Sequence, residues 1–274
     1  MKIGIIGQGF VGNAVYQKFK EYFDIKTYDI DNSKCNSSFD NLLDYSKIIF
    51  ICLPTPMNQD GSCNDETVRK TLKLINTRAK NLIIVLKSTV PPGSTSTYNS
   101  LYKNLSIVFN PEFLTERNAV NDYKNQDRII LGGPRPSTTI LKQLFSIVFV
   151  KCHIIKTGST HAEFIKYFTN CYLATKVSFS NEMYELAKSF DLDYDKVVEY
   201  STLDSRLGKT HFNVPGPDGD KGFGGHCFPK DLNAIIYLTK EKSTLNNVLK
   251  SVIKTNDKVR KNRDWEKMKG RAIN

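Results

Sequence analysis

The sequence predicts an α/β fold in which an N-terminal, Rossmann-like, doubly wound parallel sheet is followed by a mainly helical domain. Three observations predict it. The glycine-rich turn Gly7–Gly12 directly follows a short apolar run. Apolar runs then recur to about residue 150, and helical patterns dominate the remainder. Because 274 residues suffice for two domains that each bury a core, we expect domains at 1–155 and 156–274.

The apolar runs of the first half are continuous rather than alternating, as is typical of parallel strands that are covered on both faces. The expected strands are Ile3–Ile6, Ile25–Tyr28, Ile48–Leu53, Leu82–Leu86, Ile107–Phe109, Ile129–Leu131 and Val148–Val150. The amphipathic segment Asp65–Arg78 is suited to a crossover helix. Three polar stretches follow strands, where such folds bind ligands, although each could equally be a plain turn: Pro54–Pro56, Lys87–Gly93 and Asn110–Glu116.

The glycine turn predicts a dinucleotide site. In Gly7-Gln8-Gly9-Phe10-Val11-Gly12 the glycines permit a tight turn and allow a pyrophosphate to lie on the N-terminus of the following helix. Asp29, seventeen residues after Gly12, ends the second strand and is placed to bind a ribose 2′-hydroxyl. This acid favours NAD over NADP, whereas nearby Lys34 leaves NADP open.

Composition and charge exclude several classes of protein. With 40% apolar residues and no apolar run near the ~18 residues that a membrane helix needs, we expect a soluble protein with no membrane segment. The N-terminal apolar run is interrupted at Gly4 and Gly7, before a signal-peptide core could form, and the six cysteines show no C-x-x-C pair. Reduced thiols in the cytoplasm are therefore expected. The four histidines are scattered without ligand spacing, so no metal is expected.

The net charge of +11 is concentrated near the end of the chain. Residues 240–274 hold eleven Lys or Arg against four Asp or Glu. A specific nucleic-acid site would interleave aromatic residues with these cations, and only Trp265 is present there. We therefore interpret the stretch as a solvated helix face with a basic end, and expect no specific nucleic acid.

The loop Gly222–Asp231 carries the strongest signal for chemistry. It reads Gly-Phe-Gly-Gly-His-Cys-Phe-Pro-Lys-Asp, so Cys227 stands in a glycine-rich loop three residues before Lys230. Glycines allow close approach to a bound molecule, and Pro229 is suited to the start of a helix. Helix N–H groups and a lysine favour the nucleophilic thiolate. A buried structural cysteine is the alternative.

A long helix is expected from Thr160 to about Lys188. Thr160 and Glu163 match a capping box, and Phe164, Phe168, Cys171 and Thr175 form one stripe. Lys166 and Asn170 are four residues apart and share another face. They could be exposed polar residues, or an amine and an amide that together stabilise a developing oxyanion.

Together these motifs resemble the UDP-glucose/GDP-mannose dehydrogenase family, from Lys2 to about Leu238. The resemblance rests on Gly7–Gly12, Leu53–Pro56, Lys87–Pro91, Asn110–Leu114 with Glu116, Asp127–Gly132, Lys166 with Asn170, and Gly222–Asp231. It implies oxidation of a nucleotide-sugar C6 alcohol to a carboxylate with two NAD⁺, with UDP-glucose as the expected substrate and UDP-glucuronate as the product.

The resemblance also implies a role for each matching residue. Cys227 captures the intermediate aldehyde as a thiohemiacetal and then a thioester; the other catalytic positions are Lys166, Asn170, Asp231, Glu112 and Thr89. The cofactor positions are Gly7, Gly9, Phe10, Val11, Gly12, Asp29, Lys34, Thr55, Thr89, Glu116 and Lys230. The substrate positions are Glu112, Phe113, Leu114, Lys166, Asn170, Arg206, Phe223 and Gly224.

The chain departs from the family pattern at three places. Arg117 replaces a glycine after Glu116, and a family stretch appears as Asp204-Ser205-Arg206-Leu207-Gly208. Arg206 is expected to reach a neighbouring subunit's substrate, which implies a homodimer. The resemblance implies a further α/β domain after about Leu238, which we expect to be missing here, so a non-catalytic binding module, or one completed by a partner chain, is the alternative. A cysteine hydrolase built on His226 and Cys227 is disfavoured because adjacent residues rarely face each other.

Overall fold

The computed structural model describes residues 1–79 and 81–274. The chain divides into two compact units, which are described separately. The first comprises residues 1–55 and 65–166, and the second comprises 56–64 and 167–274. Within the described ranges, every helix is too short or too polar to cross a membrane.

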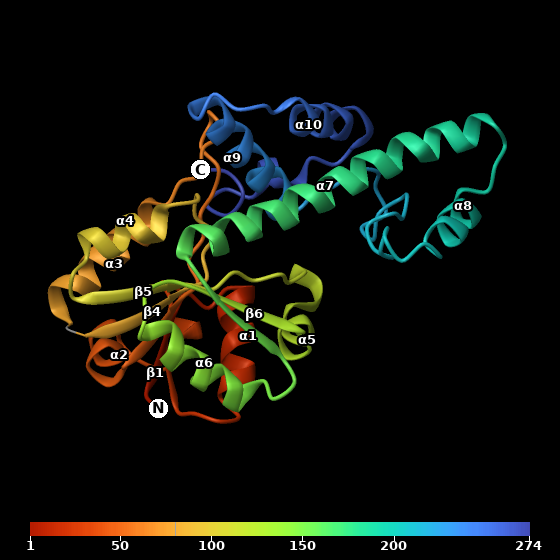
Figure 1. Ribbon diagram of the computed structural model, residues 1–274. Coiled ribbons are helices and arrows are strands. Elements are labelled where there is room, and N and C mark those ends of the chain that lie inside the picture. Colours follow the sequence, from red (N-terminus) through yellow and green to blue (C-terminus); the bar gives the residue numbers. More distant parts are fainter. Residues whose placement is uncertain (80) are drawn as a thin grey trace. The chain divides into compact units, whose positions relative to one another are not determined.

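The first unit is built on a seven-stranded sheet in the order β2-β1-β3-β4-β5-β6-β7 (Figure 1). The strands are β1 (Ile3–Ile6), β2 (Ile25–Tyr28), β3 (Ile48–Ile51), β4 (Leu82–Leu86), β5 (Leu105–Phe109), β6 (Arg128–Gly132) and β7 (His153–Thr157). Strands β1 to β5 are parallel. The strand order reverses at β1 and β3, and ligands bind at such a switch point in open α/β sheets. The predicted α/β class is confirmed.

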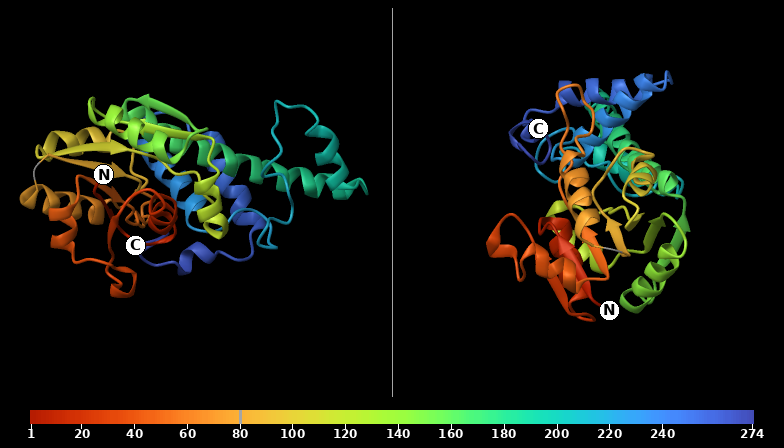
Figure 2. Two further views of the ribbon diagram at one scale, coloured as in Figure 1. Left: turned by 90° about the horizontal axis from the view of Figure 1, so that it is seen from below. Right: turned by 90° about the vertical axis from the view of Figure 1, so that its left-hand side faces the viewer.

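Helices cover both faces of this sheet (Figures 1 and 2). They are α1 (Phe10–Phe19), α2 (Phe39–Tyr45), α3 (Glu66–Arg78), α4 (Ser94–Leu101), α5 (Ala119–Lys124) and α6 (Ser137–Val148), with short 3₁₀ turns at Asn32–Lys34 and Glu116–Asn118. One apolar core lies between the sheet and α1, α5 and α6. The other lies between the sheet and α2, α3 and α4. Two dry faces explain why the inner strands β1, β3 and β4 are continuous apolar runs.

The far edge of the sheet differs from the prediction. β6 pairs with β5 in the antiparallel direction through Phe109 and Gly132, and β7 is parallel to β6, so the sheet is mixed. The strand expected at Val148–Val150 is wrong. Leu141, Leu144, Phe145 and Val148 repeat at helical spacing and are all buried on one face of α6. The edge strand is β7, whose partly exposed residues interrupt the apolar pattern.

The predicted capping box at Thr160 and Glu163 is also wrong. Helix α7 (Ser159–Ser189) begins one residue before Thr160. The buried Glu163 carboxylate accepts hydrogen bonds from Gly93 N–H at 2.6 Å and Thr95 N–H at 2.7 Å. These donors belong to the N-terminus of α4, so Glu163 caps another helix of the first unit.

The second unit is helical. It contains most of α7, together with α8 (Tyr194–Ser201), α9 (Cys227–Glu241), α10 (Asn247–Val259) and a 3₁₀ turn at Asp264–Lys267. α7, α9 and α10 share an apolar core with Phe223. The segment 56–64 lies beside the last residues of the chain (Figure 1). Met57 N–H donates to Ala272 O at 2.8 Å, and Asn274 N–H donates to Met57 O at 2.9 Å.

Candidate functional site

The three glycines of the first turn have different physical roles. Gly7 has φ +90°, and a Cβ there would lie 2.5 Å from Cys52 O. A Cβ at Gly12 would lie 1.8 Å from Gly7 O. The fold itself therefore requires glycine at both positions. A Cβ at Gly9 would meet no atom within 4 Å, which leaves backbone at the start of α1 open to a bound anion.

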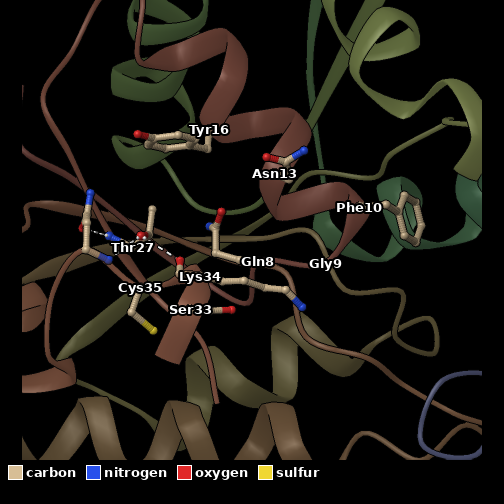
Figure 3. Close-up of a pocket in the computed structure, with 10 residues that line it drawn as sticks. Gln8, Gly9, Phe10, Asn13, Tyr16, Thr27, Ser33, Lys34 and Cys35 are labelled. Carbon is tan, nitrogen blue, oxygen red and sulfur yellow. Dashed lines mark hydrogen bonds between the residues drawn. The ribbon is translucent and has the colours of Figure 1, made fainter. Parts of the chain in front are cut away.

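A cavity of about 540 Å³ opens beside this turn. Figure 3 shows Asn13 and Tyr16 of α1 on one side of it, and Ser33, Lys34 and Cys35 of the segment after β2 on the other. The remaining lining residues are Gln8, Gly9, Phe10, Thr27 and Asn36. The turn after β1 and the end of β2 thus frame one pocket, as the sequence predicted for a dinucleotide fold.

Asp29 is fixed by two backbone N–H groups. Gln8 N–H donates to its Oδ2 at 2.6 Å, and Asp31 N–H donates to its Oδ1 at 2.9 Å. The Lys34 ammonium, which could have favoured a 2′-phosphate, lies 3.1 Å from the Asp31 carboxylate. The Asp29 carboxylate next to the glycine turn would repel a 2′-phosphate, and Lys34 is already paired with Asp31. Both observations favour NAD over NADP.

The ends of β3 and β4 are joined by side chains. Thr55 Oγ1 donates to Thr89 O at 2.7 Å, and both threonines are buried. Leu53 N–H donates to Ser88 Oγ at 2.9 Å. Two predicted ligand-binding stretches, Pro54–Pro56 and Lys87–Gly93, are therefore joined at one edge of the sheet.

Glu112 and Lys166 form a buried ion pair in the first unit. The Lys166 ammonium donates to Glu112 Oε1 at 2.9 Å and to Glu112 O at 2.6 Å. Leu114 N–H donates to Glu112 Oε2 at 2.8 Å. Burial acts to raise the pKa of Glu112, but the Lys166 charge and these hydrogen bonds outweigh it, so the pKa is lowered.

Lys87, which follows β4, is a second buried cation of the first unit. Its ammonium donates to Asn110 Oδ1 at 2.9 Å and to Asn110 O at 3.2 Å. Burial lowers the pKa of Lys87 to about 8, and the charges of Glu112 and Lys166 act on it with opposite signs. Sequence reasoning placed Lys87 in a motif without a role, because no pattern signals that a lysine is buried.

In the second unit, Asn170 and Lys230 both hold Asp231. Asn170 Nδ2 donates to Asp231 Oδ2 at 2.6 Å, and the Lys230 ammonium donates to Asp231 Oδ1 at 2.5 Å. All three side chains are buried. Burial acts to lower the pKa of Lys230, but Asp231 and the Cys63 and Cys227 thiols raise it above its usual value. The alternative that Lys166 and Asn170 are exposed is wrong, because both side chains are buried, whereas Phe164 and Phe168 of the predicted apolar stripe are exposed.

Cys227 is the first residue of α9, so its thiol lies at a helix N-terminus, and Pro229 occupies the first turn as expected. Its Sγ lies 3.4 Å from Nε2 of His226, which is buried. The expectation that these adjacent residues do not face each other is therefore wrong. His226 is the residue that precedes the helix, and its backbone is already helical, with φ −92° and ψ −20°.

Three other residues predicted to bind substrate or cofactor have varied surroundings. The Phe113 ring lies under Arg128, 4.6 Å from the guanidinium carbon, and under Lys166, 5.5 Å from its nitrogen. Glu116 is exposed in a 3₁₀ turn. Arg206 is exposed and forms a bidentate ion pair with Asp204.

Sequence profiles of one family match both halves of the chain. The NAD binding domain of the UDP-glucose/GDP-mannose dehydrogenase family matches residues 26–149, and its central domain matches residues 160–258. The chain belongs to the UDP-glucose/GDP-mannose dehydrogenase family. NAD is accordingly the cofactor of its first domain.

Individual relatives agree with this assignment. The chain is 31% identical to UDP-glucose 6-dehydrogenase TuaD of Bacillus subtilis, over 94% of this chain and 63% of the relative. It is 35% identical to UDP-glucose 6-dehydrogenase of Rickettsia conorii, over 87% of this chain and 55% of the relative. It thus spans between half and two thirds of these curated relatives.

Solved structures agree on the fold. A UDP-glucose dehydrogenase from Pyrobaculum islandicum superposes with a TM-score of 0.85 at 26% identity, covering 94% of this chain and 68% of that one. A GDP-mannose dehydrogenase from Pseudomonas aeruginosa superposes with a TM-score of 0.69 at 22% identity, covering 94% and 69% respectively, which supports the fold alone.

Proposed function

We propose that the protein is an NAD-dependent nucleotide-sugar dehydrogenase that oxidises a C6 alcohol to a carboxylate. The observation that carries the proposal is the start of α9, where Cys227 is the first residue of the helix that also carries Lys230 and Asp231. Asn170 and Lys230 both donate hydrogen bonds to the buried Asp231 carboxylate. A thiol at a helix N-terminus is suited to nucleophilic catalysis. The names of the relatives support UDP-glucose as the substrate and UDP-glucuronate as the product.

The cofactor is proposed to bind at the glycine turn. Gly9 leaves room for the pyrophosphate at the N-terminus of α1, and the fixed Asp29 carboxylate accepts hydrogen bonds from the ribose. When bound, NAD supplies the hydride acceptor for both oxidations. Thr55 and Thr89, which are joined at the ends of β3 and β4, line the same edge of the sheet.

Covalent capture by Cys227 separates the two oxidations. The alcohol carbon first loses a hydride and its oxygen a proton, which gives an aldehyde. The Cys227 thiolate then attacks this carbon, a C–S bond forms, and the carbonyl electron pair moves to oxygen. Loss of a second hydride gives a thioester; water adds, the C–S bond breaks, and carboxylate and thiolate result.

The charged residues are assigned to oxygen and to water. Lys166 and Asn170 are proposed to donate hydrogen bonds to the oxyanion that develops on the captured carbon. Glu112 and Asp231 are each paired with a buried lysine, at 2.9 and 2.5 Å, and are proposed to accept protons during hydrolysis. His226, at 3.4 Å from Sγ, accepts the thiol proton and so gives the thiolate that attacks the aldehyde carbon.

Following NADH absorbance with a panel of UDP- and GDP-sugars tests this proposal. Two NADH for each sugar consumed are expected with a UDP-hexose. Absence of NADH with every sugar contradicts it. NAD binding without turnover would favour the alternative of a binding module that a partner chain completes, which is motivated by the chain's limited coverage of its relatives.

The glycine turn makes a prediction that separates folding from cofactor binding. Gly9→Ala should leave the melting temperature nearly unchanged but weaken NAD binding about 10-fold to 100-fold, because its methyl group occupies ligand space. Gly12→Ala should destabilise the first domain by at least ~3 kcal/mol, because its Cβ meets Gly7 O at 1.8 Å. Calorimetric melting and NAD titration measure both effects. Equal NAD affinity of Gly9→Ala and wild type would contradict the proposed pyrophosphate position.

We also propose that the protein is a homodimer. Five large apolar side chains of α7 in the second unit share one stripe of the helix and are each 38% to 65% exposed: Phe168, Tyr172, Phe179, Met183 and Leu186. Apolar stripes of this length indicate a protein interface. The exposed Arg206 would then reach the partner's substrate. Sedimentation over a range of concentrations tests the association.

A further inference from the structure

The glycine loop before Cys227 is held from the side of α10. Asn256 of α10 accepts a hydrogen bond from Phe223 N–H at 2.7 Å and donates one to Phe223 O at 3.1 Å. A Cβ at Gly222 would lie 2.3 Å from Asn256 Oδ1. This glycine is therefore required by packing against α10, in addition to its φ of +68°.

Two more residues continue this contact at intervals of four along the chain. Asp264 accepts hydrogen bonds from Gly225 N–H at 3.1 Å on both carboxylate oxygens. A Cβ at Gly224 would lie 2.2 Å from Arg260 Nη2 and 2.4 Å from Asp264 Oδ1. Asn256, Arg260 and Asp264 thus contact three consecutive loop residues, 223 to 225.

Arg260 is the centre of the contact. Its side chain is 1% exposed, and its Nη2 lies 2.6 Å from Asp218 Oδ2 and 3.6 Å from Asp264 Oδ1. Its Nε lies 3.6 Å from Asp220 Oδ2. Two backbone carbonyls complete the set, with Nε donating to Asn262 O at 2.8 Å and Nη1 to Lys221 O at 3.4 Å. One planar cation therefore joins the segment that leads into the loop, residues 218–221, to the segment after α10, residues 262–264.

A fully buried arginine is costly unless its partners are fixed. Asp220 is fixed, since it also accepts hydrogen bonds from Lys261 N–H at 3.1 Å and Asn262 N–H at 2.7 Å. Both Arg260 and Asp264 lie beyond residue 258, where the match to the family's central domain ends. The cysteine loop is thus supported by residues outside the matched region.

We propose that Arg260, acting through Asp264, is a positioning residue that fixes the backbone of Phe223–Gly225 and thereby the approach to the Cys227 thiol. The inference rests on the proposed function for its effect on catalysis. The claim that Arg260 and Asp264 fix the loop backbone does not depend on the proposed function, because these contacts exist whether or not a sugar is oxidised. Misplacement of a reacting group by about 1 Å can lower a rate on the order of 100-fold.

The test compares Arg260→Gln with Arg263→Gln in the full chain. Arg263 is the matched control, because it is partly exposed and pairs with Asp257 and Glu266 rather than with the loop. In Arg260→Gln, amide hydrogen exchange of residues 222–226 should accelerate at least ~10-fold, and kcat should fall about 10-fold to 100-fold with the KM for NAD unchanged. Arg263→Gln should change neither.

Two further variants keep the proposal testable. Arg260→Lys keeps the positive charge but loses the planar guanidinium that donates to several acceptors at once. Amide hydrogen exchange of residues 222–226 should therefore be accelerated in this variant too. Asp264→Asn keeps an acceptor for Gly225 and should give an intermediate loss, and it replaces Arg260→Gln if that variant does not fold. Unchanged exchange in the loop overturns the proposal. Accelerated exchange with an unchanged kcat overturns the proposed effect on catalysis. An inactive wild type would contradict the proposed function, and the hydrogen-exchange result would still show whether Arg260 fixes the loop.

Discussion

Cys227→Ala should abolish carboxylate formation, with at least a ~10³-fold loss of turnover, while NAD affinity stays at the wild-type value. The alanine removes the only step that holds the aldehyde carbon for a second oxidation, so the yield should fall from two NADH per sugar to one or fewer. NAD is the cofactor of the first domain and is proposed to bind at the turn after β1, so its affinity is not expected to change in this variant.

Two other variants define this result. Cys152→Ser, at a half-buried cysteine of the first unit, should retain full turnover. His226→Gln should lower the rate of aldehyde capture about 10-fold to 100-fold, because the imidazole nitrogen 3.4 Å from Sγ no longer accepts the proton. Turnover is followed by NADH absorbance and product by mass spectrometry. Two NADH per sugar from Cys227→Ala would refute the covalent mechanism.

The central part of the fold could be predicted because its signals are local. Leu82–Leu86 is one strand in both the prediction and the structure, since a strand buried on both faces is a continuous apolar run. The end of α6 was mistaken for a strand because three apolar residues fit either period. The direction of β6 could not be predicted, since it depends on pairing with β5 through Phe109 and Gly132, which are distant in sequence.

For the candidate site, residue identities were predictable and their partners were not. The glycine loop and Cys227 follow from a short motif, whereas Arg260 stands in a basic stretch that resembles a solvated helix face. Only the structure shows that this arginine is buried beneath the loop. Glu163 is similar: its spacing fits a cap on its own helix, but its carboxylate caps α4, which lies more than sixty residues earlier.

The Glu112–Lys166 pair should produce the largest effect on stability. Both side chains are almost completely buried, so removal of one partner leaves an uncompensated charge in a dry environment. Glu112→Gln removes the carboxylate charge that lies 2.9 Å from the Lys166 ammonium, while the second cation Lys87 still acts on Lys166. We expect a loss of about 3–5 kcal/mol in the free energy of unfolding at pH 7, measured by urea denaturation.

A double-mutant cycle separates the charge from the packing. Lys166→Met alone leaves the Glu112 carboxylate buried, whereas Glu112→Gln/Lys166→Met removes both charges and should cost clearly less than the sum of the single changes. Glu66→Gln is the control, because Glu66 pairs with Lys70 at 2.8 Å on an exposed helix face and its loss should not be measurable. Additive single effects at the buried pair would contradict the assigned ion pair.

The same pair predicts a pH dependence with a definite sign. The pKa of Glu112 is lowered in the folded protein from its ordinary value of 4.5, so the folded state holds fewer protons at this group than the unfolded state. Its stabilisation is complete above pH 4.5 and is lost as the pH falls through the folded pKa. The difference in unfolding free energy between wild type and Glu112→Gln should therefore shrink in acid, because protonated Glu112 resembles glutamine. A difference that stays constant to pH 3 would show that the carboxylate does not carry the charge that stabilises Lys166.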